Sequence, residues 1–214
     1  GFDVHTRHES QLMTTDAVLA AEARLVVLAQ RGDGVAVAEE HVEMSLLECA
    51  ANGRELNAGQ RALVRAMATS GAKLQLALAP AGTGKTTAMT ALTRSWQNAG
   101  GRVVGFAPTA AAAAVLRKDI EATTETLAKF VDITRRLRRG EQVTVPEWYT
   151  AIGADTLVIV DEAGMTGTLD LDEAVTTLAD RGATVRLIGD DQQLASVASG
   201  GVLRDIHDLS LIHI

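Results

Sequence analysis

The stretch that most constrains the fold of this chain is Ala79-Pro80-Ala81-Gly82-Thr83-Gly84-Lys85-Thr86-Thr87, which follows an apolar run and opens a helix-like segment. A loop with this spacing turns backbone N–H groups inward to cradle phosphates, while a lysine reaches the terminal phosphates and a hydroxyl ligates magnesium. The helix that follows adds the positive end of its dipole to the same anion site. Glycine suits such a loop because a Cβ would obstruct the close approach of the backbone to the phosphates.

We therefore expect this loop and the helix start to bind ATP together with Mg²⁺. Within the site, Lys85 is also assigned a catalytic role and Thr86 is assigned to the metal. The loop departs from the full pattern at Ala79, where the pattern has glycine. The alternative is an ordinary glycine-containing turn between strand and helix, which the pattern Gly-x-Gly-Lys-Thr-Thr after an apolar strand disfavours. The residues assigned to nucleotide binding here are Ala81, Gly82, Thr83, Gly84, Lys85, Thr86 and Thr87.

The composition indicates a globular protein that does not attract nucleic acid through its overall charge. Its 214 residues suffice for one substantial α/β core with a smaller accessory segment. The formal net charge is −7, so any DNA contact has to be local. Cys49 is the only cysteine, which fits a reducing cytoplasm. No apolar run reaches the ~20 residues of a membrane span. The N-terminus resembles no signal peptide, and we expect a piece cut from a longer protein.

Short aliphatic runs alternate with helical patterns along most of the chain. Aliphatic strands that are apolar on both faces predict an α/β fold, with a parallel sheet covered by helices on both sides. A small helical segment, whose first helix is capped by Thr15 or Asp16, precedes it. Strands are expected at 74–78, 102–106, 156–160 and 185–188, and helices at 14–31, 36–51, from the loop to 98, at 110–120 and at 124–139.

The expected organisation has three parts. A helical segment occupies 1–54, and the α/β domain occupies 55–208. The tail at 209–214 has no counterpart that we recognise, and it is interpreted as a cloning or assembly artefact.

Two carboxylates follow the expected strand at 156–160. Ligands of parallel sheets bind at the carboxyl ends of the strands. Phosphoryl transfer needs one carboxylate that holds magnesium together with Thr86, and a second that orients and deprotonates the attacking water. Asp161 and Glu162 are assigned these roles in that order. The alternative is an acidic pair that only opens a surface turn.

Two glutamines complete the predicted site. Gln60 stands three residues after Asn57, in the position that closes a capping box at a helix start. Its amide can instead pair with the edge of adenine, and we favour this role because Gln60 lies just ahead of the strand that leads into the loop. Gln193 follows the last expected strand, where a neutral amide can sense the γ-phosphate and report it to another part of the protein.

Five short motifs resemble those of superfamily 1 helicases and occur in the same order. They are Leu56-Asn57-x-x-Gln60, Ala81-Gly82-Thr83-Gly84-Lys85-Thr86, Ala107-Pro108-Thr109, Asp161-Glu162-Ala163-Gly164-Met165 and Gly189-Asp190-x-x-Gln193-Leu194. The acidic motif and the helix around 19–25 are most similar to the RecD-like helicase part of conjugative relaxase–helicases of the MobF type. The resemblance covers about 14 to 204, which is nearly the whole chain.

This resemblance implies a RecA-like P-loop NTPase domain that translocates 5′ to 3′ on single-stranded DNA, in a protein that nicks and unwinds plasmid DNA. It also implies partners missing from this chain: a second RecA-like domain, whose arginines stabilise transition-state charge, and a relaxase domain. The sequence fixes no oligomeric state. Two other functions stay open, a RecD-like repair helicase unrelated to conjugation and a degenerate domain that only binds single-stranded DNA.

The DNA-contacting segments of the family map onto Pro108, Thr109 and Thr126. Many relatives continue the first of these segments with Gly-Lys, whereas this chain has Ala110-Ala111. The change removes a cation and leaves hydroxyl and backbone N–H groups as the expected contacts. Thr109 is alternatively a helix N-cap. The paired arginines at 135–139 either track a phosphate backbone or form a solvated helix face.

Overall fold

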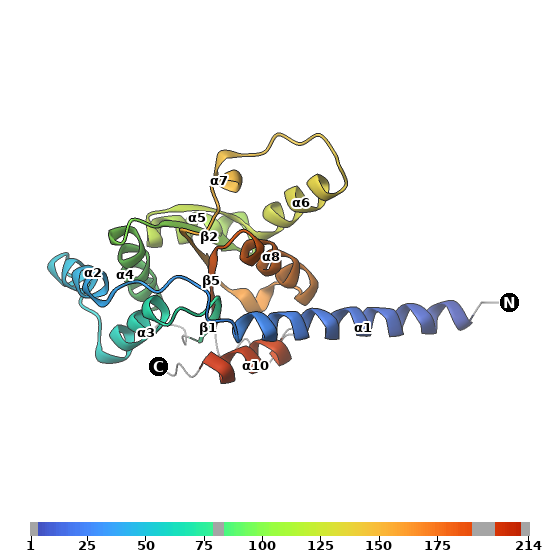
Figure 1. The fold of residues 1–214 in the computed structure, drawn as a ribbon, viewed down its shortest axis with the longest axis horizontal. Coiled ribbons are helices and arrows are strands. Elements are labelled where there is room, and N and C mark those ends of the chain that lie inside the picture. Colours follow the sequence, from blue (N-terminus) through green and yellow to red (C-terminus); the bar gives the residue numbers. More distant parts are fainter. Residues whose placement is uncertain (1–3, 79–83, 190–199, 211–214) are drawn as a thin grey trace.

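The structure, a computed structural model, describes residues 4–78, 84–189 and 200–210. Figure 1 shows a central sheet with helices packed on either side of it. The elements in chain order are α1 (Val4–Ala29), α2 (Glu39–Ala51), α3 (Ala58–Thr69), β1 (Leu74–Leu78), α4 (Lys85–Asn98), β2 (Arg102–Ala107), α5 (Ala110–Ile120), β3 (Thr123–Thr126), α6 (Leu127–Arg138), α7 (Glu147–Thr150), β4 (Thr156–Val160), the 3₁₀ turn η1 (Ala163–Met165), α8 (Thr168–Asp180), β5 (Thr184–Gly189) and α10 (Gly200–Ser210).

Within the described residues the sheet has five strands, all parallel, in the order β1-β5-β4-β2-β3. Leu78 at the end of β1 is level with Gly189 at the end of β5. Val160 at the end of β4 is level with Leu187. β5 therefore lies between the strand that precedes the phosphate loop and the strand that precedes the acidic pair. All three strands point their carboxyl ends to the same edge of the sheet.

Both faces of the sheet are buried, and each face has its own apolar core. Val158 and Val160 of β4 belong to the core under α1, α6, α8 and α10. Leu157 and Ile159 of the same strand belong to the core under α2 to α5. Alternate residues of one strand thus serve opposite faces, which explains the continuous apolar runs in the sequence. The predicted α/β fold, a parallel sheet covered on both sides, is confirmed.

α1 begins earlier than predicted. The expected helix starts near Thr14 under a cap at Thr15 or Asp16, but the helix is continuous from Val4, so the predicted cap is wrong. No glycine or proline lies between Phe2 and Arg31, and these are the residues that most strongly interrupt a helix. The first half of α1 projects beyond the sheet (Figure 1).

The helix expected at 124–139 is wrong at its start. Thr123–Thr126 forms the edge strand β3, parallel to β2, and the helix α6 begins only at Leu127. Three of these four residues are threonines, whose branched Cβ favours strands. Thr124 is buried, and its hydroxyl donates to the carbonyl of Ala113 at 2.7 Å. Pairing with the free edge of β2 therefore outweighs the helical pattern that continues through α6.

Two helices beyond the acidic pair are absent from the prediction. α8 buries Leu171, Ala174, Val175 and Leu178 at helical spacing, and α10 packs on α1 and β1. Because α10 extends through Ser210, the first two residues of the predicted tail continue a helix. None of the helices in the described ranges is long and apolar enough to cross a membrane.

The N-terminal helices are split between the two faces of the sheet. α1 packs on α8 and α10, whereas α2 packs on α4. The Arg24 guanidinium donates to the buried carboxylate of Asp172 at 2.6 Å, which ties α1 to α8. The second half of α1 and the helix α2 thus pack against the α/β core on opposite sides. The predicted domain boundary at 54 stays a prediction.

Candidate nucleotide-binding site

The predicted site lies at the edge formed by the carboxyl ends of β1, β5 and β4. Gly84 is the N-cap of α4, with a φ of 79°, a left-handed value that favours glycine. Lys85, Thr86 and Thr87 then form the first turn of α4, whose N-terminus points its backbone N–H groups and its dipole at this edge. Ala81, Gly82 and Thr83 lie outside the described residues.

The structure brings together two of the predicted residues. Lys85 Nζ lies 2.7 Å from Asp161 Oδ1, in a hydrogen-bonded ion pair between α4 and the end of β4. The side chains are 31% and 15% exposed. Lys85 and Asp161, the predicted metal-binding carboxylate, are thus in direct contact, although they lie 76 positions apart in the sequence.

Backbone hydrogen bonds hold the acidic pair in place. The Asp161 N–H donates to the Phe106 carbonyl at 2.8 Å, and the Glu162 N–H donates to Asp161 Oδ1 at 2.9 Å. Glu162 is half-buried and has a φ of 51°, in the left-handed region that few non-glycine residues adopt. This sharp turn ends the strand and starts η1. Strained backbone of this kind clusters at active sites.

The predicted metal ligand Thr86 has a partner that the sequence reading missed. Its Oγ1 donates to Asp119 Oδ2 of α5 at 3.3 Å, and the structure gives no hydrogen bond between Thr86 and Asp161. Asp119 lies in the last turn of the alanine-rich helix α5 and belongs to no motif, so only the packing of α5 on α4 reveals it. The described residues contain no cluster of three His, Cys, Asp or Glu side chains able to hold a metal ion. A shared magnesium site of Thr86 and Asp161 stays a prediction.

Gln60 forms the capping box that the sequence offers as the alternative to adenine binding, and its amide also lies against Gly84. Its Oε1 accepts from the Asn57 N–H at 2.8 Å, and its own N–H donates to Asn57 Oδ1 at 2.9 Å. A Cβ placed on Gly84 would lie 2.1 Å from Gln60 Nε2. A Cβ at this position would have to displace the Gln60 amide, and the left-handed φ of Gly84 independently favours glycine. Contact with adenine stays a prediction.

A buried arginine fixes the other end of α3. Arg186 of β5 is fully buried, and it donates to the carbonyl of Met67 at 2.8 Å and to that of Ala72 at 2.9 Å. Burial lowers the pKa of Arg186 to about 9, because the surrounding apolar residues disfavour the charge. The helix that presents Gln60 to the loop is thus held at both ends. Gln193 lies outside the described residues.

The predicted DNA contacts lie at the same edge as the nucleotide site. Thr109 follows β2 and accepts from the Ala112 N–H at 3.1 Å, and Thr126 ends β3 and accepts from the Lys129 N–H at 3.3 Å. Both threonines are therefore N-caps, of α5 and α6. Pro108 precedes Thr109 and is half-buried. Contact of Pro108, Thr109 and Thr126 with DNA stays a prediction.

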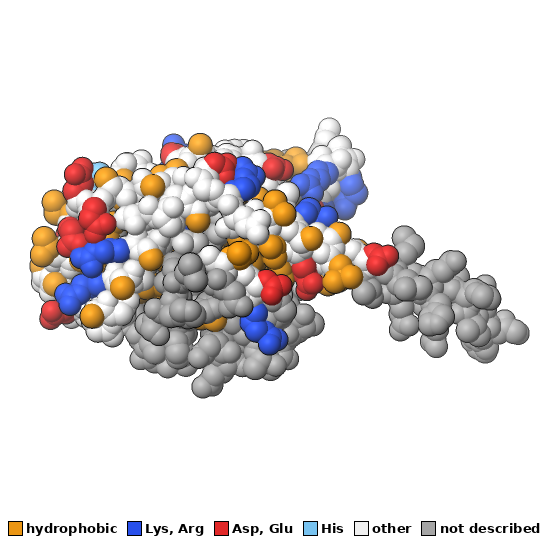
Figure 2. Space-filling view, turned by 60° about the horizontal axis from the view of Figure 1, so that its bottom comes forward, with side chains coloured by type: hydrophobic (Ala, Val, Ile, Leu, Met, Phe, Trp, Pro, Cys, Tyr) orange, Lys and Arg blue, Asp and Glu red, His pale blue; other side chains and the backbone are white. Residues whose placement is uncertain are grey.

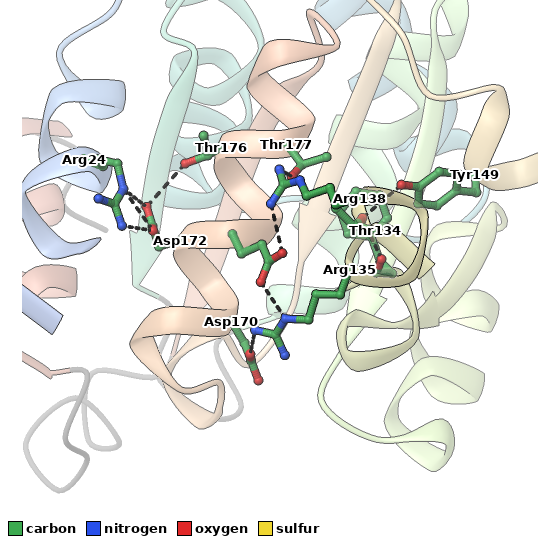
Figure 3. Close-up of polar contacts among 11 residues, drawn as sticks. Arg24, Thr134, Arg135, Arg138, Tyr149, Asp170, Asp172, Thr176 and Thr177 are labelled. Atoms are coloured by element: carbon green, nitrogen blue, oxygen red, sulfur yellow. Dashed lines mark hydrogen bonds and ion pairs between the residues drawn. The ribbon is translucent and has the colours of Figure 1, made fainter. Parts of the chain in front are cut away.

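The paired arginines at 135–139, in the last turn of α6 and at its C-cap, are engaged with carboxylates. Arg135 bonds Asp170 and Glu173 of α8 at 2.6 and 2.7 Å, and Arg138 bonds Glu173 at 3.0 Å (Figure 3). Arg136 and Arg139 bond Glu141 at 2.9 and 2.6 Å. The solvated helix face is therefore the better of the two interpretations. On the face in Figure 2, basic side chains likewise occur in small groups, most with acidic ones alongside.

Comparison with known proteins agrees with the motifs. The sequence profile of a family described as "AAA domain" matches residues 55–212. Over 197 residues the chain is 29% identical to the conjugal transfer protein TraA of Agrobacterium fabrum, which covers 91% of this chain and 16% of that protein. It is 34% identical over 137 residues to TraA of Rhizobium radiobacter, a match that covers 64% of this chain and 12% of that protein. It is 30% identical over 155 residues to the multifunctional conjugation protein TraI of Escherichia coli K12, a match that covers 70% of this chain and 8% of that protein.

The chain thus spans 16% or less of the length of these three relatives. The profile match and the conjugal transfer proteins confirm the family resemblance that the ordered motifs predict.

Proposed function

The chain belongs to the AAA domain family, and from this premise we propose that it is the ATP-dependent motor domain of a DNA helicase in a conjugative relaxase. The observation that carries the proposal is the Lys85–Asp161 pair, which joins the start of α4 to the end of β4. The names of the relatives support the conjugative setting. Because the chain spans so little of those relatives, the activity and partners of the whole protein are part of the proposal.

In this proposal the loop and the first turn of α4 bind the phosphates of ATP. Backbone N–H groups of 81–84 and the helix dipole attract the anion. Lys85 exchanges Asp161 for phosphate oxygens, which frees the carboxylate to hold magnesium together with Thr86. The donors fit this metal, since magnesium prefers oxygen ligands and takes substrate phosphates among them. A magnesium ion held there would supply positive charge that offsets the charge developing on the phosphate oxygens.

Three further side chains have separate roles in this proposal: Glu162 acts on the attacking water, Gln60 on adenine and Gln193 on the γ-phosphate. Glu162 orients the attacking water and accepts its proton, a role that its half-buried position beside Asp161 supports. Gln60 binds the adenine edge from its place against Gly84. Gln193 senses the γ-phosphate, since it follows β5, whose end lies between β1 and β4.

DNA binding and efficient turnover involve further groups. Pro108, Thr109 and Thr126 contact single-stranded DNA at the edge they share with the nucleotide, so that DNA and ATP can influence one another. A second RecA-like domain of the full-length protein supplies the arginines that stabilise transition-state charge. We place this motor in the cytoplasm, which the single cysteine supports.

The proposal is tested by nucleotide binding and turnover of this chain. Calorimetry with magnesium and a slowly hydrolysed ATP analogue should show one binding site. ATP turnover should be slow, because a charge-stabilising arginine is worth ~10³–10⁵ in rate. Absence of binding would contradict the motor function and favour the degenerate DNA-binding module. Vigorous DNA-stimulated turnover by the monomeric chain would contradict the need for a second domain.

A further inference from the structure

A carboxylate outside every predicted motif faces the hydroxyl of Thr86, the residue proposed to bind magnesium in the first turn of α4. Thr86 Oγ1 donates to Asp119 Oδ2 at 3.3 Å, and Asp119 lies 33 residues further along the chain, in the last turn of α5. Asp119 is half-buried. No ion pair joins it to a cation among the side chains that the structure describes, so the Thr86 hydroxyl is the polar partner of this carboxylate there.

A second threonine fixes the position of Asp119 relative to Thr86. The hydroxyl of Thr90, one turn further along α4, lies 2.9 Å from the Thr86 carbonyl and 2.6 Å from the Asp119 carbonyl. Thr90 is buried, with 1% of its surface exposed. This contact ties the backbone of α5 at Asp119 to the first two turns of α4, which places the Asp119 side chain within reach of Thr86.

A hydroxyl that binds a metal ion needs an acceptor for its hydrogen, and Asp119 lies where it can be that acceptor for Thr86. A threonine hydroxyl has one hydrogen and two lone pairs. When a lone pair faces a cation, the O–H has to point away from it, toward an acceptor. An anionic acceptor fixes that orientation and makes the oxygen a better ligand, as the partners of metal-bound histidines do.

We propose that Asp119 is a positioning residue that orients the Thr86 hydroxyl for magnesium and strengthens magnesium binding. This inference rests on the proposed function, because it requires nucleotide and magnesium at this site. Asp119 touches neither the substrate nor the metal, and it acts through Thr86. Its effect is therefore on the magnesium requirement, and nucleotide binding without magnesium does not depend on it.

The test measures the magnesium concentration at half-saturation for binding of a fluorescent, slowly hydrolysed ATP analogue to this chain. Asp119→Ala should raise that concentration about tenfold, the lower end of the range for lost outer-shell partners. Nucleotide affinity in EDTA should stay within twofold of the unsubstituted chain. Asp119→Asn, which keeps the shape and an acceptor oxygen, should give a smaller increase and serves if the alanine variant fails to fold.

Two controls separate positioning from general charge or stability. Glu121→Ala removes the same charge two residues later, where the carboxylate faces Arg94 at 3.8 Å, and should change the magnesium requirement less than twofold. In a chain that carries Thr86→Ala, adding Asp119→Ala should have no further effect.

Equal magnesium requirements for Asp119→Ala, Asp119→Asn and Glu121→Ala would overturn the inference while leaving the proposed function intact. An undiminished effect of Asp119→Ala in the Thr86→Ala background would overturn it too. If the unsubstituted chain binds no nucleotide with or without magnesium, the proposed function fails and the inference falls with it.

Discussion

Short ion pairs occur in two regions of the molecule, the phosphate edge of the sheet and the face formed by α6, α8 and α1, and we assign them different roles. At the phosphate edge, Lys85 pairs with Asp161 at 2.7 Å. On the face of α6, α8 and α1, Arg135 and Arg24 make pairs of 2.6 Å with Asp170 and Asp172 (Figure 3). Distance alone does not distinguish the two regions. What differs is the setting: a strand end and a helix N-terminus in one, the sides of three helices in the other.

The difference shows which pairs can exchange partners. Lys85 and Asp161 lie at a sheet edge beside backbone N–H groups that attract anions, so incoming phosphate can replace the carboxylate. The arginines of α6 each contact carboxylates of neighbouring segments, and Glu173 bonds both Arg135 and Arg138. Such surface pairs add little stability singly, and together they hold α6 beside α8. In the proposed function the first region binds a ligand, whereas the second joins helices.

The largest effect is expected from Glu162. In the full-length protein, Glu162→Gln should lower ATP turnover by roughly 10² to 10⁴, the typical contribution of a general base, and leave nucleotide affinity unchanged. Steady-state turnover with single-stranded DNA measures the loss. Glu141→Gln, at a carboxylate that pairs with Arg136 and Arg139, is the matched control and should turn over normally. Retained unwinding by Glu162→Gln would exclude Glu162 as the base.

A smaller effect is expected where α1 meets α8. Arg24→Ala leaves the carboxylate of Asp172, whose side chain is 8% exposed, with Thr176 at 3.3 Å as its remaining hydrogen-bond partner among the described side chains. The loss should destabilise the fold by about 1 kcal/mol, since Arg24 itself is half-exposed. Thermal unfolding should shift by about 2 to 4 °C. Arg102→Ala breaks a pair exposed on both sides and should shift less. A changed nucleotide affinity in Arg24→Ala would contradict the assignment of this ion pair to stability alone.

The smallest effect is expected from the arginines of α6. A double variant, Arg135→Gln with Arg138→Gln, should change the affinity for single-stranded DNA less than about threefold, because carboxylates of α8 already pair with both side chains. Fluorescence anisotropy with a labelled oligonucleotide at fixed salt measures this. A tenfold loss, together with a weaker salt dependence, would instead make α6 a phosphate-binding face.

The sequence predicts best what short-range patterns determine. The bounds of β1, α5 and β4 agree residue for residue with the prediction, because apolar runs bounded by Gly, Pro or an N-cap mark them. The placement of Lys85 and Asp161 at one edge of the sheet also follows from motif order and the parallel strands, whereas their direct ion pair is seen only in the structure. β3 escapes prediction because its pairing with β2 is a tertiary contact. Asp119 escapes because nothing local distinguishes it from a surface acid.

The central claim is that Lys85 binds nucleotide phosphate, and calorimetry on this chain tests it most directly. With magnesium and a slowly hydrolysed ATP analogue, Lys85→Ala should weaken binding roughly 100-fold or more, because a charge-assisted hydrogen bond to phosphate is lost. Lys118→Ala, at an exposed lysine of α5, is the control and should bind as the unsubstituted chain does. Unchanged affinity in Lys85→Ala would contradict the site and the function proposed for it.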